Sequence, residues 1–244
     1  MYAINTLKLS SGIIGVESTE PLPDKIIKVE THKAGHQEYR YNLHKVSGNF
    51  YPLTCGGGEY KIKVHRQVEG QLYKMIQEES VLCYMPDPHA VFLQSNVNMP
   101  WADDMECVIF ASNLTKDMAS DAEKVKTIWD YMISNYHYDT EFAERIKANN
   151  GKYNYIPWLN KIWRDKKDIC FGLTSLYNSM LRAVGVKCQM LHGEIANGYH
   201  CWSAIWQCNK WIYSDVTYGI AYHKMNKTYV PDMLRDKYTV KYIY

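Results

Sequence analysis

The stretch that decides the fold is residues 166–185, Lys-Lys-Asp-Ile-Cys-Phe-Gly-Leu-Thr-Ser-Leu-Tyr-Asn-Ser-Met-Leu-Arg-Ala-Val-Gly. Its apolar side chains recur at the spacing of one helix face, at Leu173, Leu176, Tyr177, Met180, Leu181 and Val184. Gly185 is a residue type that favours the end of a helix. The stretch therefore predicts an amphipathic helix that begins near Cys170, with the cysteine in its first turn.

Strand-like segments follow this helix, and another helix precedes it. The strand-like segments are 186–191, 199–207, 210–216 and 238–244, with turn signals at Asn197-Gly198 and Cys208-Asn209. Upstream, Ser120-Asp121-Ala122-Glu123 has the form of a capping box, which predicts a helix over about residues 121–135. Residues 120–244 are thus expected to form an α+β domain, with helices and an antiparallel meander.

The first half of the chain has the pattern of short strands. Segments 25–30, 38–43, 59–68 and 71–78 are rich in β-branched and aromatic residues and are separated by glycine and proline. They predict a small β-sandwich-like module, of immunoglobulin or fibronectin III type, over residues 1–85. Met85-Pro86-Asp87-Pro88 favours an extended connector, expected over residues 86–119. Gly56-Gly57-Gly58 is interpreted as a hairpin turn, since no Lys-Ser/Thr pair follows it.

Composition limits the classes of partner. The chain has 244 residues, of which 46% are hydrophobic, and its 28 basic and 26 acidic residues give a net charge of +2. So small a charge predicts no general attraction to nucleic acid. No run of about 18 apolar residues predicts a membrane span, and the first residues lack the pattern of a secretory signal. The expected location is the cytoplasm, or the cell exterior or wall if a leader precedes Met1 in the natural protein, and the oligomeric state stays open.

The cysteine count points to chemistry rather than to a disulfide framework. Seven cysteines, an odd number with no Cys-x-x-Cys pair, disfavour such a framework. Cys170 alone is predicted in the first turn of a long helix, where the helix dipole stabilises a thiolate. His200 opens one predicted strand and Asp215 closes the next, so pairing of the strands would make them cross-strand neighbours. The simpler alternative is a buried structural cysteine.

A zinc site is a further alternative for the cysteines of the second half. Its ligands would be Cys188, His192, Cys201 and Cys208, but the spacings between them match no usual zinc pattern. We therefore expect no metal and no cofactor.

Several separated segments carry a resemblance to a known family. They are 126–139, 166–173, 180–186, Gly193, 199–202 and 211–217. In this order they are similar to the core of the transglutaminase-like superfamily, in the bacterial type that carries an N-terminal β-module. The resemblance implies a papain-like fold with Cys170 as nucleophile, His200 as general base and acid, and Asp215 as the residue that orients the histidine.

Three aromatic residues are further candidates for the oxyanion or substrate site. The resemblance matches Tyr138 to an aromatic residue near the oxyanion site. Trp202 and Trp158 are the other candidates, although strand residues such as Trp202 belong more often to the core, and the anchor of a loop is the favoured interpretation of Trp158.

The sequence departs from the family pattern near the cysteine. Asp168 stands where a glycine is usual, two residues before the nucleophile, and Gly172 stands where relatives often have an aspartate. Val216 replaces a proline after the triad aspartate, and Cys201 replaces a small residue after the histidine. None of these changes removes a member of the triad.

The expected function is that of a cysteine enzyme acting on amide bonds of protein or peptide substrates through a Cys170 thioester. The thioester would be released by water, as in a peptidase or amidase, or by an amine, as in a transglutaminase. The alternative is a catalytically weak or inactive binding or scaffold protein that uses the β-module, which the departures at Asp168 and Gly172 favour. Acyl transfer to arylamines is disfavoured, because Lys167-Asp168-Ile169 replaces the Arg-Gly-Gly of that family.

Overall fold

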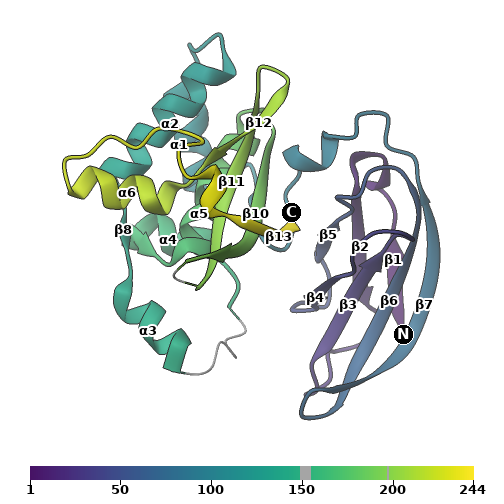
Figure 1. Ribbon diagram of the computed structural model, residues 1–244. Helices are drawn as coiled ribbons and strands as arrows, with labels where there is room; N and C mark the ends of the chain where they lie inside the picture. The colour runs from purple at the N-terminus through teal and green to yellow at the C-terminus, as the bar shows by residue number, and fades with distance from the viewer. Residues whose placement is uncertain (149–154, 197) are drawn as a thin grey trace. The chain divides into compact units, whose positions relative to one another are not determined.

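A computed structural model describes residues 1–148, 155–196 and 198–244. The chain forms two compact units, Met1–Val97 and Asn98–Tyr244 (Figure 1). In the described residues no helix combines the length and the apolar character that a membrane crossing needs. Each unit has its own sheets, and the prediction of a mixed α+β fold is confirmed.

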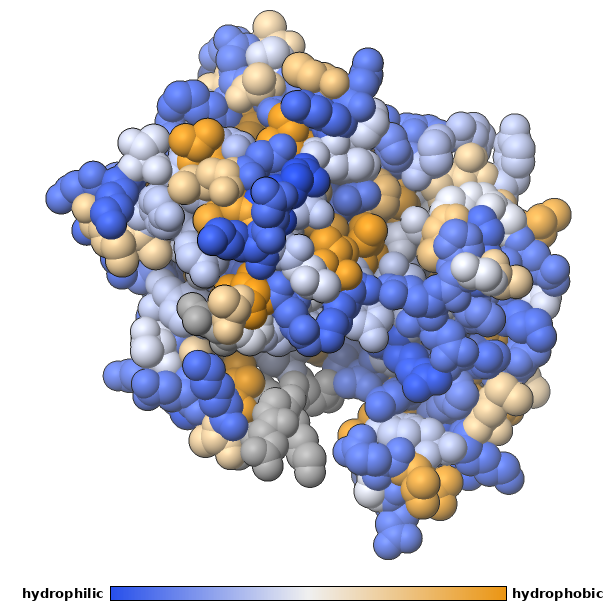
Figure 2. All heavy atoms as spheres, viewed as in Figure 1, coloured by the Kyte–Doolittle hydropathy of each residue, from blue (hydrophilic) through white to orange (hydrophobic). Residues whose placement is uncertain are grey.

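The first unit consists of two antiparallel sheets. One has the order β1 (Tyr2–Asn5), β2 (Ile13–Ser18) and β5 (Phe50–Pro52), and the other has the order β4 (Tyr39–Asn42), β3 (Ile27–His32), β6 (Gly58–Glu69) and β7 (Leu72–Cys83). The short helices η1 (Leu9–Ser11) and η2 (Ala90–Leu93) lie outside the strands. The rings of Tyr41 and Tyr51, from different sheets, have centroids 5.0 Å apart, so the sheets pack face to face. Side chains on the visible face of this unit are mostly hydrophilic (Figure 2).

The second unit has six helices and a four-stranded antiparallel sheet of order β12-β11-β10-β13 among its described residues. Its elements, in chain order, are α1 (Glu106–Thr115), α2 (Asp121–Asn135), β8 (His137–Tyr138), α3 (Thr140–Ala148), α4 (Leu159–Asp165), β9 (Lys167–Asp168), α5 (Cys170–Ala183), β10 (Cys188–Ile195), β11 (Gly198–Gln207), β12 (Lys210–Ser214), α6 (Val216–Lys224), η3 (Arg235–Lys237) and β13 (Thr239–Ile243). β8 and β9 pair in parallel. Figure 1 shows the helices of this unit gathered on one side of its sheet.

Helix α5 lies between the other helices and the sheet, and it uses a different kind of side chain on each side. The predicted apolar face contributes Leu173, Leu176, Tyr177, Met180 and Leu181 to a core shared with α1, α2 and α4. The face toward the sheet is polar. Its polar side chains are spaced about one helical turn apart, so they form a line along the helix. The sequence pattern predicted the first face and missed the second.

The polar face of α5 is bonded to the sheet along its length. The Thr174 hydroxyl donates to the Cys201 carbonyl at 3.2 Å, and the Ser203 hydroxyl donates to Asn178 Oδ1 at 2.6 Å. The Arg182 guanidinium donates to the Cys188 carbonyl at 2.7 Å. These buried polar groups are therefore satisfied, and they hold the helix that begins at Cys170 in a fixed register on the sheet.

The structure differs from the expected connector and from one expected strand. Residues 86–119 contain η2 and α1, and the division between the units falls at Val97/Asn98. Helix α1 carries no capping side chain at Met105, so the usual start signal is missing from the sequence. The expected strand 210–216 ends at Ser214, because Asp215 caps a helix, α6, that the sequence did not predict. Asn197 of the expected turn lies outside the described residues.

Candidate active site

The thiol of Cys170 lies at the first residue of α5. The helix begins after Ile169, whose side chain makes no capping hydrogen bond, and Cys170 is half-buried. The N–H groups of a first helical turn lack partners within the helix and favour a nearby anion. Two other cysteines provide a contrast, because burial raises the pKa of Cys107 and of Cys188 to about 11. Those two are therefore protonated at neutral pH, as structural thiols are.

His200 lies on β11 and connects the cysteine with the aspartate. Its Nε2 donates to Asp215 Oδ2 at 2.6 Å, and Cys170 lies close enough to its side chain to affect its pKa. Since Nε2 serves Asp215, Nδ1 is the nitrogen left for the thiol. Burial alone would lower the pKa of His200, but the Asp215 carboxylate and Cys170 outweigh it and raise this pKa to about 10. The imidazole therefore carries a proton at neutral pH.

Asp215 is fully buried and accepts hydrogen bonds on both carboxylate oxygens. Oδ1 accepts from the backbone N–H groups of Thr217 and Tyr218, at 3.0 and 3.1 Å, as the N-cap of α6. Oδ2 accepts from His200 and, at 2.7 Å, from the hydroxyl of Tyr238. Four donors on one carboxylate fix its position and satisfy its charge.

The contact between His200 and Asp215 arises differently from the sequence prediction. Strands β11 and β12 do pair as predicted, through a turn in which Cys208 and Asn209 have φ of 50° and 58°. However, the last pair of this ladder is Ser203 with Ser214, so Asp215 lies beyond it and is not a cross-strand neighbour of His200. The carboxylate reaches the imidazole because the chain turns there into α6.

The three aromatic candidates lie in different surroundings. Trp202 is fully buried and stacks on Tyr238 at 4.4 Å and on His200 at 6.1 Å, so it forms a wall behind the imidazole. Tyr138 pairs with Asp168 in the parallel β8–β9 ladder and is 37% exposed. Burial and the neighbouring Cys170 and Asp168 raise the pKa of Tyr138 to about 12. Of these candidates, Tyr138 thus lies within electrostatic reach of the thiol.

Trp158 lies at the edge of a cavity. It precedes α4, is 67% exposed, and lines a cavity of about 290 Å³ together with Tyr155 and Asp168. The cavity also has Asp139, Phe142, Arg145, Lys161, Ile162 and Lys167 in its lining. Trp158 is therefore on the same side of the nucleophile helix as Asp168.

Sequence reasoning missed three residues that shape the site. Tyr238 and Tyr229 contact Asp215, the second by accepting a hydrogen bond from the Asp215 backbone N–H at 3.0 Å. His192 is 9% exposed, and burial together with the nearby His200 lowers the pKa of His192 to about 3. It is therefore a neutral imidazole beside a charged one. The sequence contains no local signal for these contacts, since each joins residues that are far apart in the chain or on different strands.

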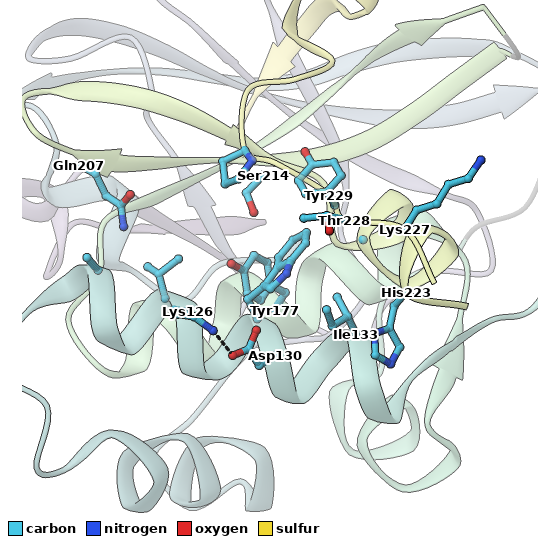
Figure 3. A pocket seen from close by; sticks show the side chains of 15 residues that line it. Lys126, Asp130, Ile133, Tyr177, Gln207, Ser214, His223, Lys227, Thr228 and Tyr229 are labelled. Carbon is cyan, nitrogen blue, oxygen red and sulfur yellow. Dashed lines mark hydrogen bonds and ion pairs between the residues drawn. The ribbon is translucent and has the colours of Figure 1, made fainter. Parts of the chain in front are cut away.

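A second cavity, of about 540 Å³, is lined by Ser214, the residue before Asp215, and by Tyr229 (Figure 3). Tyr177, Ser214 and Tyr229 face it, and Lys126 forms an ion pair with Asp130 at its rim. Tyr229 is the residue that connects this cavity with Asp215.

The segment that carries these residues is similar to known proteins. Residues 109–216 match the model of the family described as the Transglutaminase-like superfamily. Over 120 residues the chain is 28% identical to the kyphoscoliosis peptidase of Mus musculus and 27% identical to that of Homo sapiens. Each match covers 44% of this chain and 17% of the relative, so the chain spans about a sixth of the relatives' length.

One solved structure is similar in fold over most of the chain. It is a candidate cysteine protease from Cytophaga hutchinsonii, with a TM-score of 0.50 and 12% sequence identity. The likeness covers 91% of this chain and 82% of that protein, and it concerns the fold alone. The likeness to the transglutaminase-like superfamily thus lies in the segment 109–216, which includes the helix that bears Cys170.

Proposed function

We propose that the chain is a cysteine enzyme that acts on amide bonds of protein or peptide substrates through a thioester at Cys170. The observation that carries the proposal is the position of His200, whose imidazole is hydrogen-bonded to the Asp215 carboxylate and lies near the Cys170 side chain, which helps to raise its pKa. A nucleophile, a base and a group that orients the base form the arrangement that covalent catalysis requires.

In this proposal each part of the triad has a defined task. The Cys170 thiolate attacks the amide carbonyl, and the negative charge of the tetrahedral intermediate falls on its oxygen. Backbone N–H groups of the first turn of α5 donate to that oxygen. The protonated His200 then gives its proton to the leaving amine, which its raised pKa allows at neutral pH. The products of this half are the free amine and the Cys170 thioester.

The second half of the reaction releases the acyl group. Neutral His200 takes a proton from the incoming nucleophile, whose oxygen or nitrogen attacks the thioester carbonyl. The Cys170 thiolate leaves, and His200 is again protonated. Water gives a carboxylic acid and an amine gives a new amide; the name of the related kyphoscoliosis peptidases favours water. Tyr138, which lies near Cys170, is the candidate side-chain donor to the oxyanion.

The second candidate function is a catalytically weak binding protein. The observation that favours it is Asp168, a buried acidic residue two positions before the nucleophile, which adds negative charge where a thiolate must form. In this case Cys170 would be no more reactive than an ordinary exposed thiol.

Selective alkylation tests the proposal. The full-length protein is treated with iodoacetamide at pH 6, where an ordinary thiol is almost entirely protonated, and each cysteine is followed by peptide mass spectrometry. The exposed Cys208 is the internal control. We expect Cys170 to react much faster than Cys208, and this preference to disappear in His200→Ala. Equal rates for Cys170 and Cys208 in the unmodified sequence would reject the enzyme and favour the binding protein.

A further inference from the structure

We propose that Asp168 is a positioning residue of this site, which fixes the start of the nucleophile helix by holding Tyr155 and the Ile169 backbone together. The inference rests on the proposed function, because it concerns the reactivity of Cys170. It gives a role to an acidic residue that the triad chemistry does not use.

The first observation is the hydrogen bonding of a buried carboxylate. Asp168 is 8% exposed, and each of its oxygens accepts one hydrogen bond. Oδ2 accepts from the Tyr155 hydroxyl at 2.7 Å, and Oδ1 accepts from the Ile169 N–H at 2.7 Å. Ile169 is the N-cap of α5, so the carboxylate ties the residue before the nucleophile to a tyrosine from another part of the chain.

The second observation is the space above Gly172. A Cβ at this position would lie 2.5 Å from Asp168 Oδ1 and 2.7 Å from the Tyr155 hydroxyl oxygen, so any larger residue would force the Asp168 and Tyr155 side chains to shift. Gly172 is an interior residue of an α-helix, so the glycine answers a need for space rather than a backbone requirement. Asp168 and Gly172 are therefore structurally coupled, because the Asp168 side chain occupies the space that a side chain at position 172 would need.

This relation explains the two departures from the family pattern together. Where the pattern has glycine before the cysteine and often aspartate after it, this chain has aspartate at 168 and glycine at 172. Either change alone would leave a clash or an empty space.

The third observation connects the carboxylate with the thiol. The ring of Tyr155 packs edge-on against Phe171 at 5.8 Å, and Phe171 is the residue after Cys170. Burial raises the pKa of Tyr155, and the Asp168 carboxylate and Cys170 raise it further, since both lie near its hydroxyl. A substitution at Asp168 is therefore expected to alter the position of Cys170 in two ways, through the contact with Ile169 and through the contact with Tyr155.

The charges around Asp168 define which form makes these bonds. Burial raises the pKa of Asp168, the Tyr155 and Ile169 donors oppose this, and Asp139 and Lys161 act in opposite directions from the neighbouring segments. The ionised carboxylate accepts both hydrogen bonds at once. An asparagine of the same shape keeps an acceptor oxygen for the Ile169 N–H but presents an N–H group to Tyr155, so the Tyr155 hydroxyl must turn from donating to accepting, and the negative charge is lost.

The experiment measures the second-order rate of Cys170 alkylation by iodoacetamide in the full chain, relative to Cys208 in the same sample. We expect Tyr155→Phe, which removes one buried hydrogen bond and no charge, to lower this ratio by about tenfold. Asp168→Asn should lower it less, because the loss of a negative charge beside Cys170 favours the thiolate. Asp165→Asn, a change in an exposed ion pair of α4, is the matched control and leaves the ratio unchanged. A purely structural role would lower the melting temperature but not the ratio in the folded protein.

The exchange of the two residues gives the second readout. We expect Gly172→Asp alone to lower both the melting temperature and the alkylation ratio, because two carboxyl groups compete for one space. The double variant Asp168→Gly/Gly172→Asp should restore a large part of both. Additive effects of the two substitutions, or an unchanged ratio in Tyr155→Phe, would overturn the inference. Equal alkylation of Cys170 and Cys208 in the unmodified chain would instead reject the proposed function, and the melting temperatures would still decide whether residues 168 and 172 are coupled.

Discussion

The two sides of His200 are built in different ways. On the aspartate side, the Asp215 carboxylate is fully buried and accepts four hydrogen bonds, from two backbone N–H groups and two side chains. On the cysteine side, the half-buried Cys170 lies at a helix start that has no capping side chain. The orienting group is thus held by many contacts and the reacting group by few. We infer that stability depends mainly on the first side and that reactivity is adjusted on the second.

The largest effect on stability is expected from Asp215→Ala. The substitution removes the acceptor of four buried donors. Removing one partner of a buried ionic pair costs about 3–5 kcal/mol of the free energy of unfolding. Urea denaturation measures this loss, with Asp130→Ala as the control, because Asp130 is about half exposed and pairs with Lys126 on the surface. A loss for Asp215→Ala as small as that for the control would contradict the comparison.

The next effect is the pH dependence that His200 gives to stability. Its pKa of about 10 in the folded protein lies above the value near 6.5 of an unfolded histidine. The folded state therefore binds this proton more tightly, and the contribution is fully present below pH 6.5 and is lost as the pH rises toward 10. We expect a loss on the order of a few kcal/mol between these values.

Denaturation at several pH values, compared between the unmodified chain and His200→Gln, measures this term. The variant should lose stability less steeply over the same range, since it has no proton to release. Parallel curves for the two proteins would show that the imidazole is not held in its charged form.

His192 should act in the opposite direction and over a lower range. Its pKa of about 3 in the folded protein lies below that of an unfolded histidine, so the unfolded state takes up the proton first. Stability is therefore lost as the pH falls from about 6.5 toward 3. His192→Gln should flatten this acid limb and leave the alkaline limb unchanged, and NMR titration of the His192 ring checks the assignment. A ring that titrates near pH 6.5 would contradict it.

A smaller effect is expected from Tyr238→Phe. The variant loses the hydroxyl that donates to Asp215 Oδ2 but keeps the ring that stacks on Trp202. A hydrogen bond to a charged group is worth about 1.5–3 kcal/mol, so the free energy of unfolding should fall by this amount. Because three donors remain on Asp215, the Cys170 alkylation rate should change less than in His200→Ala. An equal loss of reactivity would show that Asp215 depends on this one contact.

The sequence predicted the elements whose signals are local. The helix after Cys170, the capping box at Ser120 and the pairing of the strands 199–207 and 210–216 follow from periodicity and turn residues, and the structure has them. The helix α6 escaped, because its start signal is Asp215 itself, which the pattern assigned to a strand. Asp215 both caps this helix and accepts a hydrogen bond from His200. The sequence pattern indicated the second role, and the first was therefore overlooked.

The contacts that complete the site were beyond sequence reasoning for a physical reason. Tyr238 contacts Asp215 from 23 positions away in the sequence, and Tyr155 contacts Asp168 from 13 positions away. Neither separation corresponds to the repeat of a helix or a strand, so no sequence pattern predicts these contacts. The polar face of α5 was also missed. Threonine and asparagine on a helix usually indicate a face exposed to solvent, whereas Thr174 and Asn178 are buried against the sheet. Their pattern has meaning only after the sheet is placed against the helix.

The smallest effect on stability, and the sharpest test of the cysteine side, is expected from Trp158→Ala. The side chain is 67% exposed, so the free energy of unfolding should change by no more than about 0.5 kcal/mol. It nevertheless lines the same cavity as Asp168 and Tyr155, near the start of the nucleophile helix. If this cavity receives part of the substrate, a peptidase assay on an unfolded protein such as casein should show a raised KM with kcat little changed. Iodoacetamide is a small reagent that reacts with the thiol without binding in the cavity, so the alkylation rate of Cys170 should be the same as in the unmodified chain. A fall in alkylation would mean that Trp158 supports the helix start instead, and an unchanged KM would remove it from the substrate site.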